Sequence, residues 1–101
     1  MIKVSVMYSN RDGATFDMDY YIKSHMALVR RLLGDDVKGL AVDQGLADAA
    51  GPPRYLAMGH LMFDSVDAFR SAMTAHGPAL MADIANYTNC QPVIQVSEMK
   101  L

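Results

Sequence analysis

The stretch FDMDYYIKSHMALV, residues 16–29, predicts an amphipathic helix and places a histidine on its buried side. Residues three and four positions apart lie on one face of a helix. A group that titrates near neutral pH is costly to bury unless it is hydrogen-bonded or used chemically. His25 is therefore either a satisfied core histidine or part of a functional site. The predicted face consists of Met18, Tyr21, Ile22, His25, Leu28, Val29 and Leu32.

Both ends of this helix carry recognisable signals. Asp17 can cap the first turn, and the side chains of Phe16 and Tyr21 can pack against each other across that cap. Gly34 suits the position just past the last turn, where a left-handed backbone conformation is common. The helix is therefore expected to end near residue 33.

The rest of the chain reads as four strands and a second helix. Strands are predicted at residues 2–8, 37–44, 55–63 and 92–99. Asp64 or Ser65 can cap the second helix, and Pro78 predicts a kink or break at residues 76–78, because proline lacks the backbone donor that a helix needs. The buried side of that helix is expected to carry Val66, Phe69, Met73, Leu80 and Ile84.

The element order β-α-β-β-α-β predicts an α+β, ferredoxin-like fold in one domain spanning residues 1–101. Such a fold has a four-stranded antiparallel sheet with both helices on one face. The segments 55–63 and 93–99 are apolar on both faces, with Leu56, Met58 and Met62 or their alternates on the uncovered face. We therefore expect a homodimer formed through the sheet faces.

Composition excludes several classes of function. The 101 residues are 51% hydrophobic and 20% charged, with a net charge of −2, so no basic patch points to nucleic acid or anionic lipid. A single cysteine, Cys90, excludes an intrachain disulfide and reads as a passive thiol. Without a segment of signal-peptide or membrane-span length, we expect a cytoplasmic protein. The sequence contains no phosphate loop, dinucleotide fingerprint or nucleophile elbow, and the spacing of its three histidines predicts neither a metal site nor a haem.

The remaining candidates for a functional site are imidazole and phenol groups around the buried face of the first helix and around Pro78. Such groups in an apolar cavity suit proton transfer on, or hydrogen bonding to, a small oxygenated organic molecule. His25 and His76 are the candidate catalytic residues. The alternative for each tyrosine is packing in the core or at an interface, and the direction of His60 on its strand is left open. The candidate ligand-binding residues are Tyr20, Tyr21, His60 and Tyr87.

Three segments resemble the EthD family over essentially the whole chain. They are residues 16–21 leading to His25-Met26, the Gly59-His60-Leu61 segment with Phe63, and residues 83–98, which include Asn86-Tyr87-Thr88-Asn89. The family is named for ethyl tert-butyl ether degradation and belongs to the dimeric α+β barrel superfamily. Its pattern usually has proline after the His-Met pair, where this chain has Ala27; that departure bears on helix geometry more than on chemistry.

The resemblance implies two ferredoxin-like subunits whose sheets join into a barrel, each with a cavity between sheet and helices. The superfamily includes cofactor-free monooxygenases, polyketide cyclases and lactone isomerases, and a polyketide-cyclase-like histidine would fall close to His76. EthD proteins themselves accompany a cytochrome P450 system and have no settled activity.

Three hypotheses follow for this chain. The first is a cofactor-free enzyme, a monooxygenase, cyclase or isomerase, with His25 or His76 as general base and Tyr20 or Tyr87 holding the developing oxyanion. The second is a non-catalytic binding protein in a P450-type degradation pathway. The third is a structural dimer whose cavity is filled by its own methionines, of which the chain has nine.

Overall fold

Alternating apolar and polar residues at the start of the chain form a central strand in the computed structural model, which describes residues 1–101. This strand, β1 (Ile2–Ser9), lies between β3 (Tyr55–Phe63) and β4 (Val93–Glu98), and β2 (Gly39–Gln44) pairs with the far side of β3. All three strand pairs are antiparallel, in the order β2-β3-β1-β4. The predicted ferredoxin-like sheet is confirmed, and the bounds of β3 match the prediction.

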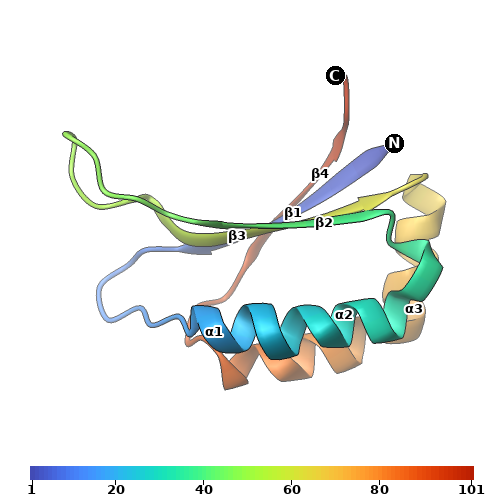
Figure 1. Ribbon diagram of the computed structural model, residues 1–101, viewed down its shortest axis with the longest axis horizontal. Coiled ribbons are helices and arrows are strands. Elements are labelled where there is room, and N and C mark those ends of the chain that lie inside the picture. The colour runs from blue at the N-terminus through green and yellow to red at the C-terminus, as the bar shows by residue number, and fades with distance from the viewer.

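All the helices lie on one face of the sheet, below it in Figure 1. The first helical segment runs through α1 (Met18–Tyr20), η1 (Tyr21–His25), α2 (Met26–Leu33) and η2 (Gly34–Asp36). The second consists of α3 (Val66–Asp83) and η3 (Ile84–Asn86). The space between this layer and the sheet holds the hydrophobic core.

Both predicted ends of the first helix and the predicted start of the second are confirmed. The side chain of Asp17 accepts a hydrogen bond from the backbone N–H of Tyr20 at 3.0 Å, and the rings of Phe16 and Tyr21 lie 5.0 Å apart. Gly34 ends α2 with a φ of 52°, a backbone conformation that residues with a Cβ rarely adopt. Ser65, one of the two predicted caps, accepts from Ala68 N–H at 3.1 Å. Local sequence signals therefore fix where the helical layer starts and stops.

The first helix differs from the prediction in its middle. Residues Tyr21–His25 form a π-helical turn, which contains more residues than an α-helical turn and so rotates the positions that follow it. As a result Leu33 is fully buried in α2 and Leu32 only partly. Ile22, which the regular spacing placed on the buried face, is 51% exposed, so that assignment is wrong. Tyr21 and His25 are both buried, as predicted.

The second helix is continuous through Pro78, so the predicted kink or break takes the form of a kink. The first turns and the last turns of α3 run in different directions in Figure 1. Two features favour a bend here, the backbone donor missing at Pro78 and a hydrogen bond of 2.9 Å from the Thr74 hydroxyl to the carbonyl of Arg70. The bend lets the last turns of α3 lie beside the first helix, so the proline shapes the helix layer without interrupting it.

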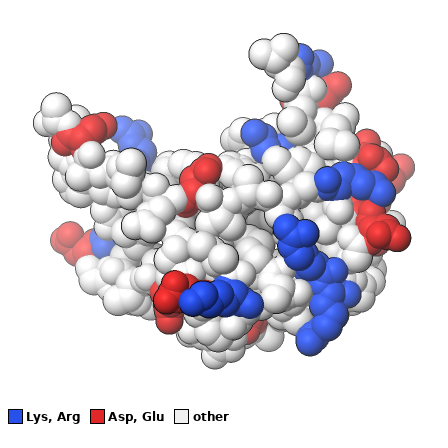
Figure 2. Space-filling model, viewed as in Figure 1, with Lys and Arg blue, Asp and Glu red and all other residues white.

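The outer face of the sheet, opposite the helices, is covered by no element of this chain. In β1, Ile2, Val4 and Tyr8 are buried toward the helices, while the residues between them face outward. Met58 and Met62 lie on this outer face, as predicted, and are half-buried. Leu56, also predicted there, packs against the core instead, because the register of β1 and β3 shifts at this position. Figure 2 shows the molecule hollowed on this side between the β2–β3 connection and the C-terminal end.

We expect Gly59→Ala to destabilise the protein, because a Cβ at this position would overlap the Tyr21 hydroxyl. The free energy of unfolding should fall by about 1–3 kcal/mol, as for other overpacking substitutions in a core. The matched control is Gly77→Ala in α3, whose added Cβ comes no closer than 3.8 Å to Met73 and should be neutral or stabilising. Chemical denaturation measures both, and equal stabilities of the two variants would contradict the expectation.

Candidate functional site

A cavity of about 90 Å³, partly open to solvent, lies between the sheet and the helices. Fourteen of its sixteen lining residues are hydrophobic. The sheet contributes Val4, Val6 and Leu61, and the helices contribute Leu80 among others. A larger hollow of about 720 Å³, lined by residues 15–19 and 85–89, is an open depression of the surface and contains no histidine. The cavity between sheet and helices is the better candidate site, because its lining is mostly apolar and includes His25.

His25 is held by Asp83, which lies 58 residues further along the chain. The imidazole Nδ1 lies 2.8 Å from Oδ2 of Asp83, and the two side chains are only 9% and 13% exposed. Asp83 also accepts hydrogen bonds through Oδ1 from the Tyr20 hydroxyl at 2.7 Å and from the Asn86 amide at 2.9 Å. The π turn presents His25 and the end of α3 presents Asp83, so the contact joins the two helices.

The carboxylate fixes which nitrogen of His25 carries the proton. Burial alone would raise the pKa of Asp83, but its hydrogen bonds with Tyr20, Asn86 and His25 lower the pKa, so the group is ionised at neutral pH. An ionised carboxylate only accepts hydrogen bonds, and the network therefore assigns the proton to Nδ1 of His25. In the neutral imidazole, Nε2 is then an acceptor.

Nε2 of His25 has no hydrogen-bond partner in the protein. Only Nδ1 of this ring is bonded, and every fully buried side-chain nitrogen or oxygen in the chain has a partner. Nε2 therefore keeps some accessible surface, while the ring itself lines the cavity. An unoccupied acceptor at the edge of an apolar cavity can bind a donor or take up a proton.

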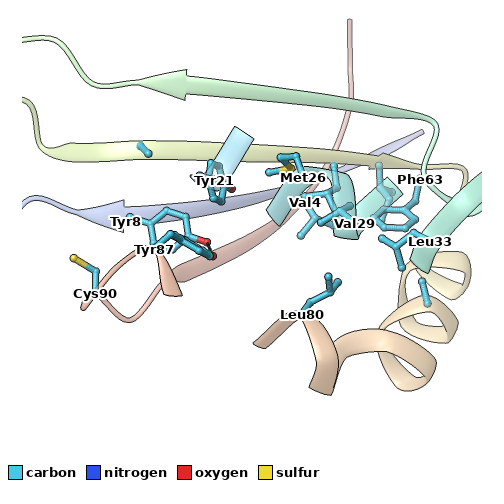
Figure 3. Close-up of a cluster of buried hydrophobic side chains, with 14 residues drawn as sticks. Val4, Tyr8, Tyr21, Met26, Val29, Leu33, Phe63, Leu80, Tyr87 and Cys90 are labelled. Carbon is cyan, nitrogen blue, oxygen red and sulfur yellow. Dashed lines mark hydrogen bonds between the residues drawn. The ribbon is translucent and has the colours of Figure 1, made fainter. Parts of the chain in front are cut away.

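Aromatic rings form the wall around His25. The ring of Tyr21 stacks on the imidazole at 5.4 Å with an interplanar angle of 11°, and the ring of Tyr87 lies 4.8 Å from it. The hydroxyls of Tyr87 and Tyr8 are 2.6 Å apart, and Figure 3 shows these two side chains together at one end of the core. Burial raises the pKa of Tyr8, Tyr21 and Tyr87, so all three hydroxyls remain protonated donors.

The structure brings some of the predicted site residues together and separates others. His25, Tyr21 and Tyr87 line the cavity, and Tyr20 reaches it only through its bond to Asp83. His60 lies on the outer face of the sheet, where it is hydrogen-bonded to Ser5. His76 is half-buried in α3, has no side-chain hydrogen bond and does not line the cavity. Of the three histidines, only His25 therefore lines the cavity.

The direction of His60, which the sequence left open, is settled by its partners. Its Nδ1 lies 3.0 Å from the Ser5 hydroxyl and its Nε2 lies 2.9 Å from Oδ2 of Asp43. Both partners lie on neighbouring strands of the outer face. His60 is thus tied into the surface that lies opposite the helices.

Two residues of the site were missed by the sequence analysis. Tyr8 continues the inward alternation of β1, so its position was predictable, but its bond to Tyr87 was not. Asp83 follows Leu80 by three residues and therefore falls on the buried side of α3 at helical spacing. A lone carboxylate on an apolar helix face was the available signal that His25 has a charged partner.

The structure also bears on metal binding and on membrane insertion. No three His, Cys, Asp or Glu side chains converge in a way that could hold a metal ion. None of the helices combines the length and the apolar character needed to cross a bilayer.

Comparison with known proteins identifies one family. The EthD domain family matches residues 13–90, and an EthD-like protein of Ralstonia eutropha JMP134 has 42% sequence identity, with 99% of this chain and 92% of that chain covered at a TM-score of 0.93. The chain belongs to the EthD family. A search of the proteins with curated functions finds no match.

Two more distant structures share the fold. An ethyl tert-butyl ether degradation family protein of Bacillus halodurans C-125 is 18% identical, with 98% of each chain covered and a TM-score of 0.76. A dimeric ferredoxin-like protein of Thermobifida fusca YX is 20% identical, with 97% of this chain and 90% of that chain covered and a TM-score of 0.63.

We expect Asp83→Asn to lower stability at pH 7 by about 1–3 kcal/mol, because the amide loses the charge-assisted hydrogen bonds. The folded pKa of Asp83 is depressed, so its contribution is fully present above the ordinary aspartate pKa of 3.8 and is lost as the pH falls through the lower folded value. The difference in unfolding free energy between wild type and variant should therefore shrink below that pH. Denaturation curves at pH 7 and pH 3 measure this difference.

Asp19→Asn is the control, because its side chain is 87% exposed and makes only one long ion pair. It should change stability little at either pH. A wild-type advantage over Asp83→Asn that grows on acidification would contradict the assignment of Asp83 as an ionised, hydrogen-bonded group.

Proposed function

We propose that this protein is a cofactor-free enzyme acting on a small oxygenated aromatic or cyclic organic molecule bound in the cavity. One observation carries the proposal: His25 lines an otherwise apolar cavity while its Nδ1 is held 2.8 Å from an ionised carboxylate. A histidine oriented by a carboxylate and left with one open nitrogen is the arrangement that general-base chemistry requires. Membership of the EthD family agrees with a role on small organic molecules but leaves the reaction open.

In this proposal His25 removes a proton from the bound molecule through Nε2. The imidazolium so formed is stabilised by Asp83, which Tyr20 and Asn86 orient. The anion left on the molecule accepts a hydrogen bond from the Tyr8–Tyr87 hydroxyl pair, whose members stay protonated because burial raises the pKa of each. Tyr20, named from the sequence as an alternative oxyanion donor, acts here as a positioning residue.

The volume of the cavity limits the size of the molecule that can bind. A cavity of about 150 Å³ is known to hold a benzene ring in another protein, and this one measures about 90 Å³. Met26, Met73 and Met81 line it, and methionine side chains change rotamer at little cost. The site therefore suits a molecule no larger than a single ring, admitted by movement of these side chains.

The second candidate function is a binding protein that holds an apolar intermediate of a P450-type pathway. The nearly complete apolar lining favours it, because such a surface binds without needing to react. Turnover by the purified protein without a partner enzyme separates the two functions. The third hypothesis, a self-filled structural dimer, has less support, because space remains beside the methionines.

We further propose a homodimer in which the outer faces of two sheets pack together. Half-buried Met7, Met58 and Met62 and the 50% exposed Val93 lie on this face. The hollow seen in Figure 2 offers a concave surface to a second copy. A dimeric relative of the same fold in Thermobifida fusca supports this arrangement. The cytoplasmic location inferred from the sequence stays a prediction.

We expect His25→Ala to abolish turnover and to weaken ligand binding per folded molecule. Stability should also fall, by about 1–3 kcal/mol, because the Asp83 carboxylate loses one of its three hydrogen bonds. Unfolding midpoint and ligand affinity are measured on one preparation. Ser24→Ala is the control: it changes an exposed residue of the same π turn and should leave both quantities unchanged. A large loss of stability with unchanged affinity per folded molecule would assign His25 to the core instead.

We expect wild-type protein to have the mass of a dimer in light scattering at micromolar concentration, and Met7→Lys to have that of a monomer. Met7 lies on the central strand of the outer face, where burying an unpaired charge is costly. Ile22→Lys, on the helix side at a 51% exposed position, should leave the dimer intact. A well-folded wild-type monomer would refute the proposed interface.

A further inference from the structure

The polar atoms of the cavity define what a ligand must supply. Of the side chains that line the cavity, only those of His25, Tyr8, Tyr21 and Tyr87 carry nitrogen or oxygen. No lysine or arginine lines the cavity. Burying an anion without a cation or a set of donors is costly, so this inventory disfavours carboxylates and phosphates. The ionised carboxylate of Asp83, directly behind His25, adds repulsion toward a second negative charge.

The direction of the hydrogen bonds further limits which chemical groups a ligand can place against His25. Since Nδ1 of His25 donates to Asp83, Nε2 of the neutral ring is an acceptor without a partner. A carbonyl or ether oxygen cannot donate, and placed against Nε2 it would leave two acceptors facing each other. A hydroxyl group can donate to Nε2.

The hydroxyls of Tyr8 and Tyr87 supply a hydrogen-bond donor that complements the acceptor on His25. The two hydroxyls are 2.6 Å apart, so one donates to the other. When Tyr8 donates, the Tyr87 hydroxyl keeps its own proton for a ligand. The rings of Tyr87 and His25 are 4.8 Å apart. An open acceptor and a free donor thus lie on neighbouring groups, which suits an oxygen that both donates and accepts.

We infer that the cavity selects neutral molecules that carry one weakly acidic hydroxyl on an apolar body, a phenol or an enol, with the hydroxyl donating to Nε2 of His25. This inference rests on the proposed function and names its substrate class. Transfer of the hydroxyl proton to Nε2 gives a phenolate or enolate paired with an imidazolium, and the net charge of the site does not change. Asp83 and the tyrosine hydroxyl stabilise the two charges so formed.

The test compares four single-ring probes on the wild-type protein by isothermal titration: phenol, toluene, benzaldehyde and benzoate. Phenol donates and accepts, toluene does neither, benzaldehyde only accepts and benzoate is an anion. We expect phenol to bind about tenfold or more tightly than toluene and benzaldehyde, the factor that one net hydrogen bond provides, and benzoate to bind weakest.

His25→Phe keeps a ring in the cavity and removes the acceptor, so the ratio of phenol to toluene affinity should fall close to one. The wild-type series stands independently of whether this variant folds. Ser24→Ala, on the same turn, should keep the wild-type ratio.

The outcomes separate the inference from the proposed function. Equal affinities for phenol, toluene and benzaldehyde would overturn the inferred hydroxyl selection and leave the cavity as a binding site for small rings. Benzoate binding as tightly as phenol would overturn the exclusion of anions. Failure of every neutral probe to bind would overturn both the inference and the proposed use of the cavity.

Discussion

The hydrogen bond between His25 and Asp83 determines the arrangement of the helix layer around the cavity. It joins residues 58 positions apart in the sequence and connects a π turn to the end of α3. Tyr20 and Asn86 donate to the same carboxylate, so three side chains from both helical segments converge on one ionised group. A buried charge must be compensated, and here the compensation orients the imidazole at the same time.

The sheet and the aromatic cluster place this network against an apolar space. β1 sends Val4 and Tyr8 inward, and the ring of Tyr8 lies in edge-to-face contact with those of Tyr21 and Tyr87. Such contacts are directional and resist collapse of the rings onto one another. The cavity between sheet and helices is thus bounded by side chains that are held from several sides, with the methionines as its adaptable part.

Much of the fold could be predicted from local signals. The alternation in β1, the cap at Asp17, the packing of Phe16 on Tyr21 and the glycine at position 34 each depend on residues close together in the chain. The π turn was not predictable, because neither the end caps nor the residue types of the helix indicate that one of its turns contains an extra residue. Ile22 was misplaced for that reason.

The site was predictable only in part. Helical spacing identified His25 and Tyr21 as inward-facing, and both line the cavity. Asp83 was missed because its partner lies in a distant segment, and periodicity says nothing about pairing between elements. His60 could not be oriented, because its strand is apolar on both sides; the bonds to Ser5 and Asp43 decide it. Long-range pairing is therefore what the sequence pattern could not supply.

The contact between Tyr21 and Gly59 bears on how this cavity could change during evolution. The Tyr21 hydroxyl occupies the space where any larger residue at 59 would place its Cβ. A larger residue at position 59 therefore requires a smaller residue at position 21. A smaller residue at position 21 with glycine kept at 59 opens space beside the backbone of β3. The two positions form a coupled pair through which descendants of this chain could enlarge or reduce their binding space while leaving His25 and Asp83 in place.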